Sequence, residues 1–206
     1  MLKRIVILWI IGLLEVLVSG CLTPVKTNMV QKIYIDPQIS VERGNTTGYV
    51  VALREVECSK AIGNYITYLK NGNSLYIDER NQWAEHPSEV IFRIVYLTLK
   101  NTNRFVDVAD AIEVKNPDLI ALVKLDKFFI VDALDRKEVV FSAEFKLRDT
   151  HSGKLVVEKR FEISKPVDSN SDYVNTMHQV LFEFSKQLAL LVNSSSLQNA
   201  KEAKEE

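Results

Sequence analysis

The sequence predicts an α+β fold: a largely antiparallel sheet with two amphipathic helices packed on one face, which is a two-layer sandwich. Three consecutive runs between Leu119 and Ile163 alternate apolar and polar residues, with the apolar residues at odd positions. Two other segments, at about residues 83–100 and 173–192, repeat apolar residues at steps of three and four. The first pattern is typical of half-buried strands and the second of amphipathic helices, so the sheet face and the helix stripes can cover one another.

The first elements of the predicted domain are short strands and a hairpin. Lys32–Asp36 and Tyr49–Cys58 are rich in β-branched and aromatic residues and are separated by a turn-rich segment. Asn64–Leu69 and Ser74–Asp78 flank Asn71-Gly72-Asn73, whose residues tolerate the positive φ of a tight turn. The two runs therefore predict a hairpin.

A helix from about Trp83 to Lys100 follows, with Val90 and Ile94 on the same face as Trp83. Pro87 falls near its first turn, where the missing N–H costs little. A short strand at residues 104–108 comes next.

The three alternating runs predict an antiparallel meander with one buried and one wet face. Turns fall at residues 135–137 and 149–153, and the middle run places Phe141 and Phe145 on the apolar side. The apolar side of the first run is Leu119, Ala121, Val123, Leu125, Phe129 and Val131. The second helix runs from Tyr173 to about Val192, and residues 194–206 are a polar tail that we expect to be disordered.

The amino terminus has the three parts of a secretion signal. Lys3 and Arg4 precede an apolar run over residues 5–18, which is interrupted by Glu15 and too short for a typical membrane span. Val18-Ser19-Gly20-Cys21 resembles the lipobox of bacterial lipoproteins, which implies cleavage after Gly20 and attachment of lipid to Cys21. Several acyl chains at about 0.8 kcal/mol per buried methylene make a nearly permanent anchor. Residues 1–20 are thus the predicted signal peptide and residues 21–31 a lipidated tether.

Charge and cysteine content limit the classes of function. The formal charge of the chain is -1, and the signal peptide carries two positive and one negative residue, so the mature part stands at -1 - (+1) = -2. A chain without a basic stripe lacks the electrostatic footprint of a nucleic-acid binder, so nucleic acid is not an expected partner. Cys58 is the only other cysteine, so a lipidated Cys21 leaves no intramolecular disulfide. Residues 32–193 are long enough for one domain.

The sequence contains no recognisable catalytic or metal-binding constellation, so we expect no enzyme activity, no metal and no cofactor. His86, His151 and His178 are not spaced as metal ligands, and neither a G-x-S-x-G elbow nor a glycine-rich phosphate loop occurs. Trp83 lies where the predicted hairpin leads into the helix. A large aromatic there is most often a packing residue, and direct contact with a ligand or partner is the alternative.

Several features in order resemble the ABC-type transport auxiliary lipoprotein family, of the paraquat-inducible protein C type. They are the lipobox at Cys21, the segment SLYIDERNQWAEHPSEVIFRI, the later LRDTHSGKLVVEKRF hairpin and the closing helix. The most specific piece is the string from Asn81 to Glu85, in which Gln82 replaces the arginine usual in relatives. The resemblance makes Asn81, Trp83 and Glu85 candidates for a partner or packing site.

The resemblance implies a non-catalytic, auxiliary part of an envelope system that moves lipids or hydrophobic compounds. Its expected partners are the membrane, through the lipid anchor, and an MCE-domain protein and permease of an ABC-type system; homo-oligomerisation stays open. Leu22 after the lipidated cysteine is not aspartate, which by analogy with enteric sorting favours the outer membrane, with the domain facing the periplasm. The alternative is a structural or assembly lipoprotein that bridges the cell wall or serves secretion machinery.

Overall fold

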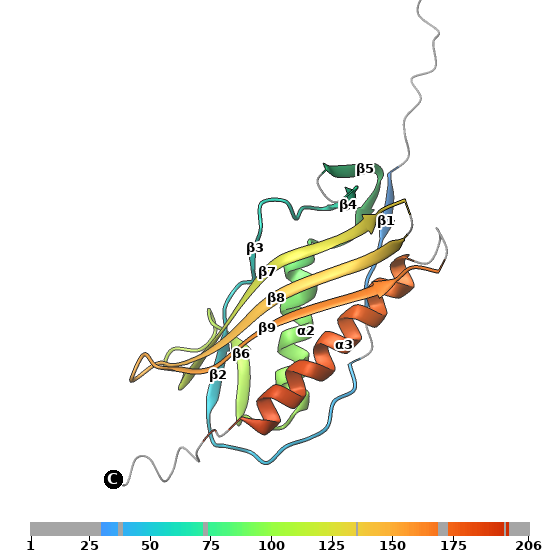
Figure 1. Ribbon diagram of the computed structural model, residues 1–206. Helices are drawn as coiled ribbons and strands as arrows, with labels where there is room; N and C mark the ends of the chain where they lie inside the picture. The colour runs from blue at the N-terminus through green and yellow to red at the C-terminus, as the bar shows by residue number, and fades with distance from the viewer. Residues whose placement is uncertain are drawn as a thin grey trace, which may run out of the picture.

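One mixed sheet with two helices makes up the part of the chain that the computed structural model describes, residues 30–36, 39–71, 74–134, 136–168, 173–195 and 197 (Figure 1). The described strands are nine in number, and their order from one edge is β1-β5-β4-β7-β2-β6, with β3 and β8 also paired to β7 and β9 paired to β8. The predicted α+β class is confirmed. The predicted signal peptide, most of the tether with Cys21, and most of the polar tail lie outside the described residues.

The predicted meander is confirmed and forms the longest pairings of the sheet. Its strands are β7 (Leu119–Asp132), β8 (Lys137–Asp149) and β9 (Leu155–Pro166), and both pairs are antiparallel. The turn after β8 is held by Asp149, whose Oδ1 accepts hydrogen bonds from the Ser152 amide at 2.6 Å and the His151 amide at 3.0 Å. These backbone bonds, and one from the Ser152 hydroxyl, lower the pKa of the Asp149 carboxyl.

The apolar side of β7 differs from the prediction beyond its middle. A β-bulge between Leu125 and Lys127 shifts the register with β8, so the inward side moves from odd to even positions. Phe128 and Ile130 are therefore buried, whereas Phe129, predicted on the core side, is only half-buried. Phe129 was therefore placed on the wrong side, whereas Val131, also predicted on the core side, is buried at 9% exposure.

The remaining strands are short, and most of their pairings are parallel. Three of them lie end to end along one edge of β7: β2 (Val50–Leu53), β3 (Glu57–Cys58) and β4 (Tyr65–Lys70). The other short strands are β1 (Gln31–Ile33) and β6 (Asp107–Asp110). The sheet is antiparallel over most of its paired length because the meander and the β4–β5 hairpin are the long pairs.

The predicted hairpin is present, but its second strand is longer than expected. β5 runs from Ser74 to Trp83, and helix α2 begins only at Pro87 and ends at Asn101. The last three residues of β5 stay extended because β1 pairs with them in parallel. The helix begins where the His86 ring accepts a hydrogen bond from the Ser88 amide, as an N-cap, so the expected start at Trp83 was wrong.

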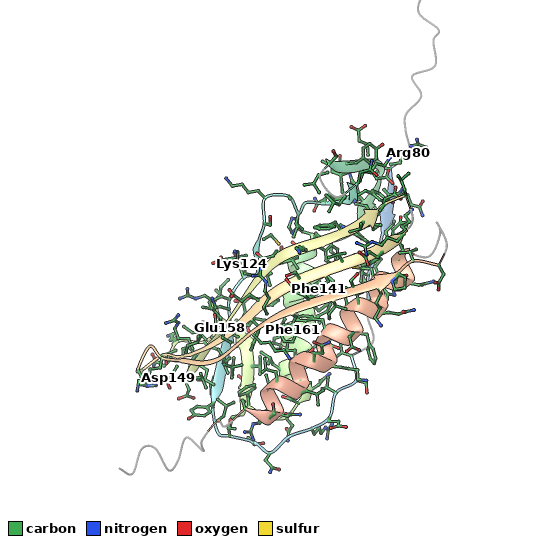
Figure 2. The ribbon with its side chains drawn as sticks, viewed as in Figure 1. Arg80, Lys124, Phe141, Asp149, Glu158 and Phe161 are labelled. Atoms are coloured by element: carbon green, nitrogen blue, oxygen red, sulfur yellow. The ribbon has the colours of Figure 1, made fainter. Side chains whose placement is uncertain are left out.

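Both helices contact each other and cover one face of the sheet, α2 over β6 and β7, and α3 (Tyr173–Ser194) over β8 and β9. Phe184 of α3 packs against the rings of Phe141 and Phe161, which Figure 2 shows on neighbouring strands above this helix. Leu197, three residues past α3, is only 8% exposed and belongs to the same core. Within the described ranges, no helix combines the length and the hydropathy that a membrane crossing requires.

Candidate functional site

The string from Asn81 to Glu85 lies where β1 meets β5, and its tryptophan is part of the core. Trp83 is 4% exposed, and its ring meets the Phe128 ring edge-on at 5.4 Å between centroids. The Trp83 amide donates to the Asn64 carbonyl at 2.7 Å, and the Ala84 amide donates to the Ile33 carbonyl at 2.7 Å. Trp83 thus fixes the end of β5 on the core and leaves little of its own surface for a partner.

Glu85 takes part in an ion pair that fastens the chain after β1. Arg93 on α2 donates one guanidinium N–H to the Glu85 carboxylate at 2.6 Å and another to the Ile35 carbonyl at 2.9 Å. The same guanidinium lies 5.7 Å from the centre of the Tyr34 ring. Arg93 therefore bridges α2, the segment after β5 and the segment after β1, and we call this group the Arg93 latch.

Asn81 differs from its two companions because it lines an open hollow of about 510 Å³. Its side-chain amide donates to the Asp78 carboxylate at 2.7 Å. Burial raises the pKa of Tyr68 to about 12, so this phenol stays protonated at neutral pH. The lining residues are Tyr68, Lys70, Tyr76, Asp78, Glu79, Arg80, Asn81, Asp132 and Lys137.

The charges of this hollow balance, with three cationic and three anionic side chains. Two of the cations also lie over aromatic rings, Lys70 at 5.3 Å from the Tyr76 centroid and Lys137 at 5.5 Å from the Tyr68 centroid. The hollow therefore has no strong preference for an anion or a cation. In the residues that the structure describes, no group of three or more histidine, cysteine, aspartate or glutamate side chains could hold a metal ion.

The structure shows one feature that the sequence did not predict, an apolar surface at the tip of the hairpin. Leu75, Tyr76 and Ile77 of β5 are 53%, 56% and 52% exposed, and Leu134 in the β7–β8 turn is fully exposed. We call these four residues the distal patch. The sequence signal for the three hairpin residues is that Leu75, Tyr76 and Ile77 are apolar at consecutive positions, a pattern more typical of a strand buried on both faces.

The fold and the order of elements can be compared with known proteins. The family model described as "ABC-type transport auxiliary lipoprotein component" matches residues 35–189, from the end of the β1 segment to the last turns of α3. The chain belongs to this family. The match includes the string from Asn81 to Glu85, the Arg93 latch except for Tyr34, and the hairpin with the whole distal patch.

Solved structures of low sequence identity are similar to this ABC-type transport auxiliary lipoprotein, and two of them, with TM-scores above 0.5, share its fold. A protein of Xanthomonas campestris has a TM-score of 0.67 at 12% identity, covering 85% of this chain and 100% of its own. An uncharacterized protein has a TM-score of 0.57 at 18% identity, covering 74% of this chain and 97% of its own. A PelC dodecamer of Paraburkholderia phytofirmans has a TM-score of 0.43 at 12% identity, covering 75% and 96%. No curated protein matches the sequence significantly.

Proposed function

We propose that this protein is a non-catalytic lipoprotein that links an ABC-type envelope transporter for lipids or hydrophobic compounds to the membrane. The observation that carries the proposal is the family match over residues 35–189. In this proposal the lipid on Cys21 holds the protein in the outer membrane with the domain in the periplasm, and the protein partners are an MCE-domain protein and a permease.

The contacts around β1 support a tethered role. β1 has only three residues, and such a short strand is marginal on its own. It is held by its register with Asn81–Trp83 and, just beyond it, by the Arg93 latch. A chain that is pulled from its amino-terminal side by a lipid anchor needs such a fastening, because the strand nearest the anchor takes the load first.

Among the three residues of the candidate site, Asn81 is the one that we propose for partner contact. Trp83 is buried and Glu85 is engaged by Arg93, whereas Asn81 borders the open hollow. The hollow presents tyrosines beside balanced charges, a composition that fits a polar protein surface better than a small ion.

The test is a pull-down of the full-length lipoprotein from detergent-solubilised envelopes of its host, with mass analysis of the amino-terminal peptide. The expected result is an acylated Cys21 and recovery of MCE-domain and permease components. Asn81→Ala should reduce that recovery, whereas Asn101→Ala, at the exposed end of α2, should not.

Recovery of cell-wall or secretion proteins in place of transporter components would instead support the structural or assembly role. A cytosolic protein with an unprocessed amino terminus would contradict the anchor itself. The mass of the recovered species by light scattering also tests whether the protein forms a homo-oligomer.

A further inference from the structure

The distal patch is unusual because it exposes apolar side chains on both faces of a strand. Leu75 and Ile77 lie on one face of the hairpin and Tyr76 lies on the other, because side chains alternate along a strand. Each of the three is nevertheless more than half exposed. Leu75 pairs with Leu69, and the next residue, Lys70, pairs with Asp132 near the end of β7. The β7–β8 turn with Leu134 therefore lies at the same end of the sheet as the hairpin tip.

β9, at the other edge of the meander, also exposes Leu155 and Val156, at 41% and 40%, but it differs from β5 in its charges. The outward face of the meander carries ion pairs of Lys146 with Glu144 and Glu158 and of Arg160 with Asp126, so charge protects that edge from unwanted contacts. β5 from Ser74 to Arg80 has a neighbour on its β4 side, while β1 reaches only Asn81–Trp83 on its other side. Among the described strands, none pairs with Leu75, Tyr76 and Ile77 on the side away from β4, and these three apolar residues precede the charged stretch Asp78–Arg80.

The direction of β1 relates the patch to the membrane. β1 is parallel to β5 with Gln31 beside Asn81, so it enters the sheet from the side of the hairpin tip. Leu75 lies opposite Leu69 on β4, and Gln82, next to Asn81, lies opposite Tyr65, so the two levels are four residues of β4 or about 13 Å apart. Eight residues separate Cys21 from Val30, and an extended chain of this length spans at most about 30 Å. The tether is thus long enough for the tip to touch the surface that holds the lipid.

We propose that the distal patch seats in the headgroup–acyl boundary of the membrane that holds the lipid on Cys21. This inference rests on the proposed anchor. Leucine and isoleucine favour the acyl region, and a tyrosine favours the boundary because its ring is apolar and its hydroxyl polar. The hairpin then acts as a second contact beside the lipid and sets the orientation of the domain, as two signals do in other peripheral proteins.

The charges around the tip identify the kind of bilayer surface. Lys70, Arg80 and Lys137 are matched by Asp78, Glu79 and Asp132 around the hollow, so its described lining forms no basic patch that would recognise anionic lipid. The expected surface is zwitterionic, and seating depends on apolar burial. Binding of the tip to the bilayer should therefore change little with salt concentration, unlike the binding of polybasic segments.

The experiment compares tryptophan fluorescence at the two ends of the long strands, in lipoprotein reconstituted into phosphatidylcholine vesicles with brominated acyl chains. Leu75→Trp reports the tip, and Leu155→Trp is the matched control at 41% exposure. Leu155 pairs with Arg148, opposite Ile120, so it lies about 35 Å along β7 from the tip. In Figure 2, the label Arg80 marks the end of the sheet with the hairpin, and the label Asp149 marks the opposite end of the long strands. Trp9 leaves with the signal peptide, and buried Trp83 is a background common to both variants.

The expected result is a blue shift and loss of most of the added emission for the tip variant, and neither change for the control. Hydrogen exchange of the unmodified lipoprotein gives a second measurement, in which vesicles should protect the β4–β5 amides relative to detergent.

Equal emission of both variants and unchanged exchange, with Cys21 acylated, would overturn the inference and leave the anchor standing. Protection in detergent that grows with protein concentration would assign this edge of β5 to a second copy and also overturn it. An unacylated amino terminus would remove both proposals.

Discussion

Replacing Phe184 by alanine tests whether α3 is held to the sheet by one aromatic contact. The Phe184 side chain is fully buried, and its ring lies 4.8 Å from the Phe141 ring and 5.0 Å from the Phe161 ring. These two rings come from β8 and β9, so the single helix residue bridges both strands. Its removal leaves a cavity between the layers, because three surrounding elements cannot all move inward.

The size of the effect follows from burial and ring contacts. A buried phenylalanine replaced by alanine costs about 3–5 kcal/mol of unfolding free energy. The two ring pairs supply about 0.5–1.5 kcal/mol each of that cost. In a domain of this size about 1 kcal/mol lowers the melting temperature by about 2–4 °C, so the expected drop is about 6–20 °C.

The matched control is Phe182→Ala on the same helix. Phe182 is half-buried, and its ring contacts the Lys186 ammonium at 5.6 Å, an interaction of at most about 1 kcal/mol at such a site. Both variants are compared with the parent by urea unfolding followed by circular dichroism. If the slope of unfolding free energy against urea concentration is unchanged, the substitution has changed the stability alone. If the two variants lay within about 1 kcal/mol of each other, the assignment of Phe184 to the centre of the interface would be refuted.

Four further substitutions or reactions probe other parts of the molecule. Phe145→Asp should prevent folding, because it buries an unpaired charge on the middle strand; a wild-type melting temperature would contradict this. Asp149→Asn should destabilise the protein above about pH 4, where the lowered pKa keeps the carboxylate charged, and this difference should vanish as the pH falls through that folded-state pKa. The thiol of Cys58, whose pKa is raised by burial, should react with iodoacetamide more slowly than a model thiol at pH 8, and equal rates would refute its burial. Arg93→Ala should speed hydrogen exchange of β1, whereas Lys100→Ala should not.

The sequence predicted the meander because each of its strands is long and has one wet face. The prediction failed at the bulge for a local reason: beyond Asp126 the residues Phe128, Phe129, Ile130 and Val131 are all apolar. An uninterrupted apolar run has no alternation, so it cannot show which side faces the core. The register with β8 decides this, and it involves residues that are distant in sequence.

The parallel pairings were beyond the reach of local patterns. β1 pairs with β5 across about 50 residues, and β2 with β7 across about 68. The stretch from Asp78 to Gln82 is polar throughout and indicates a loop when taken alone. It remains a strand because β4 and β1 supply hydrogen bonds at its two edges. The string around Trp83 was recognised through a resemblance, but its place between these edges emerged only from the fold.

β5 connects the two features by which the protein would meet the membrane. Its last residues hold β1, through which a pull from the proposed lipid anchor would enter the domain, and its first residues carry the distal patch. With the tip seated, the height of the domain is set by about 13 Å of paired strand and no longer by the full reach of the tether, about 30 Å. The long strands would then carry the turn at Asp149 away from the bilayer, toward the proposed transporter partners. A lipoprotein that only needed to be retained would require the lipid alone, so a second contact is justified only if orientation matters for the partner.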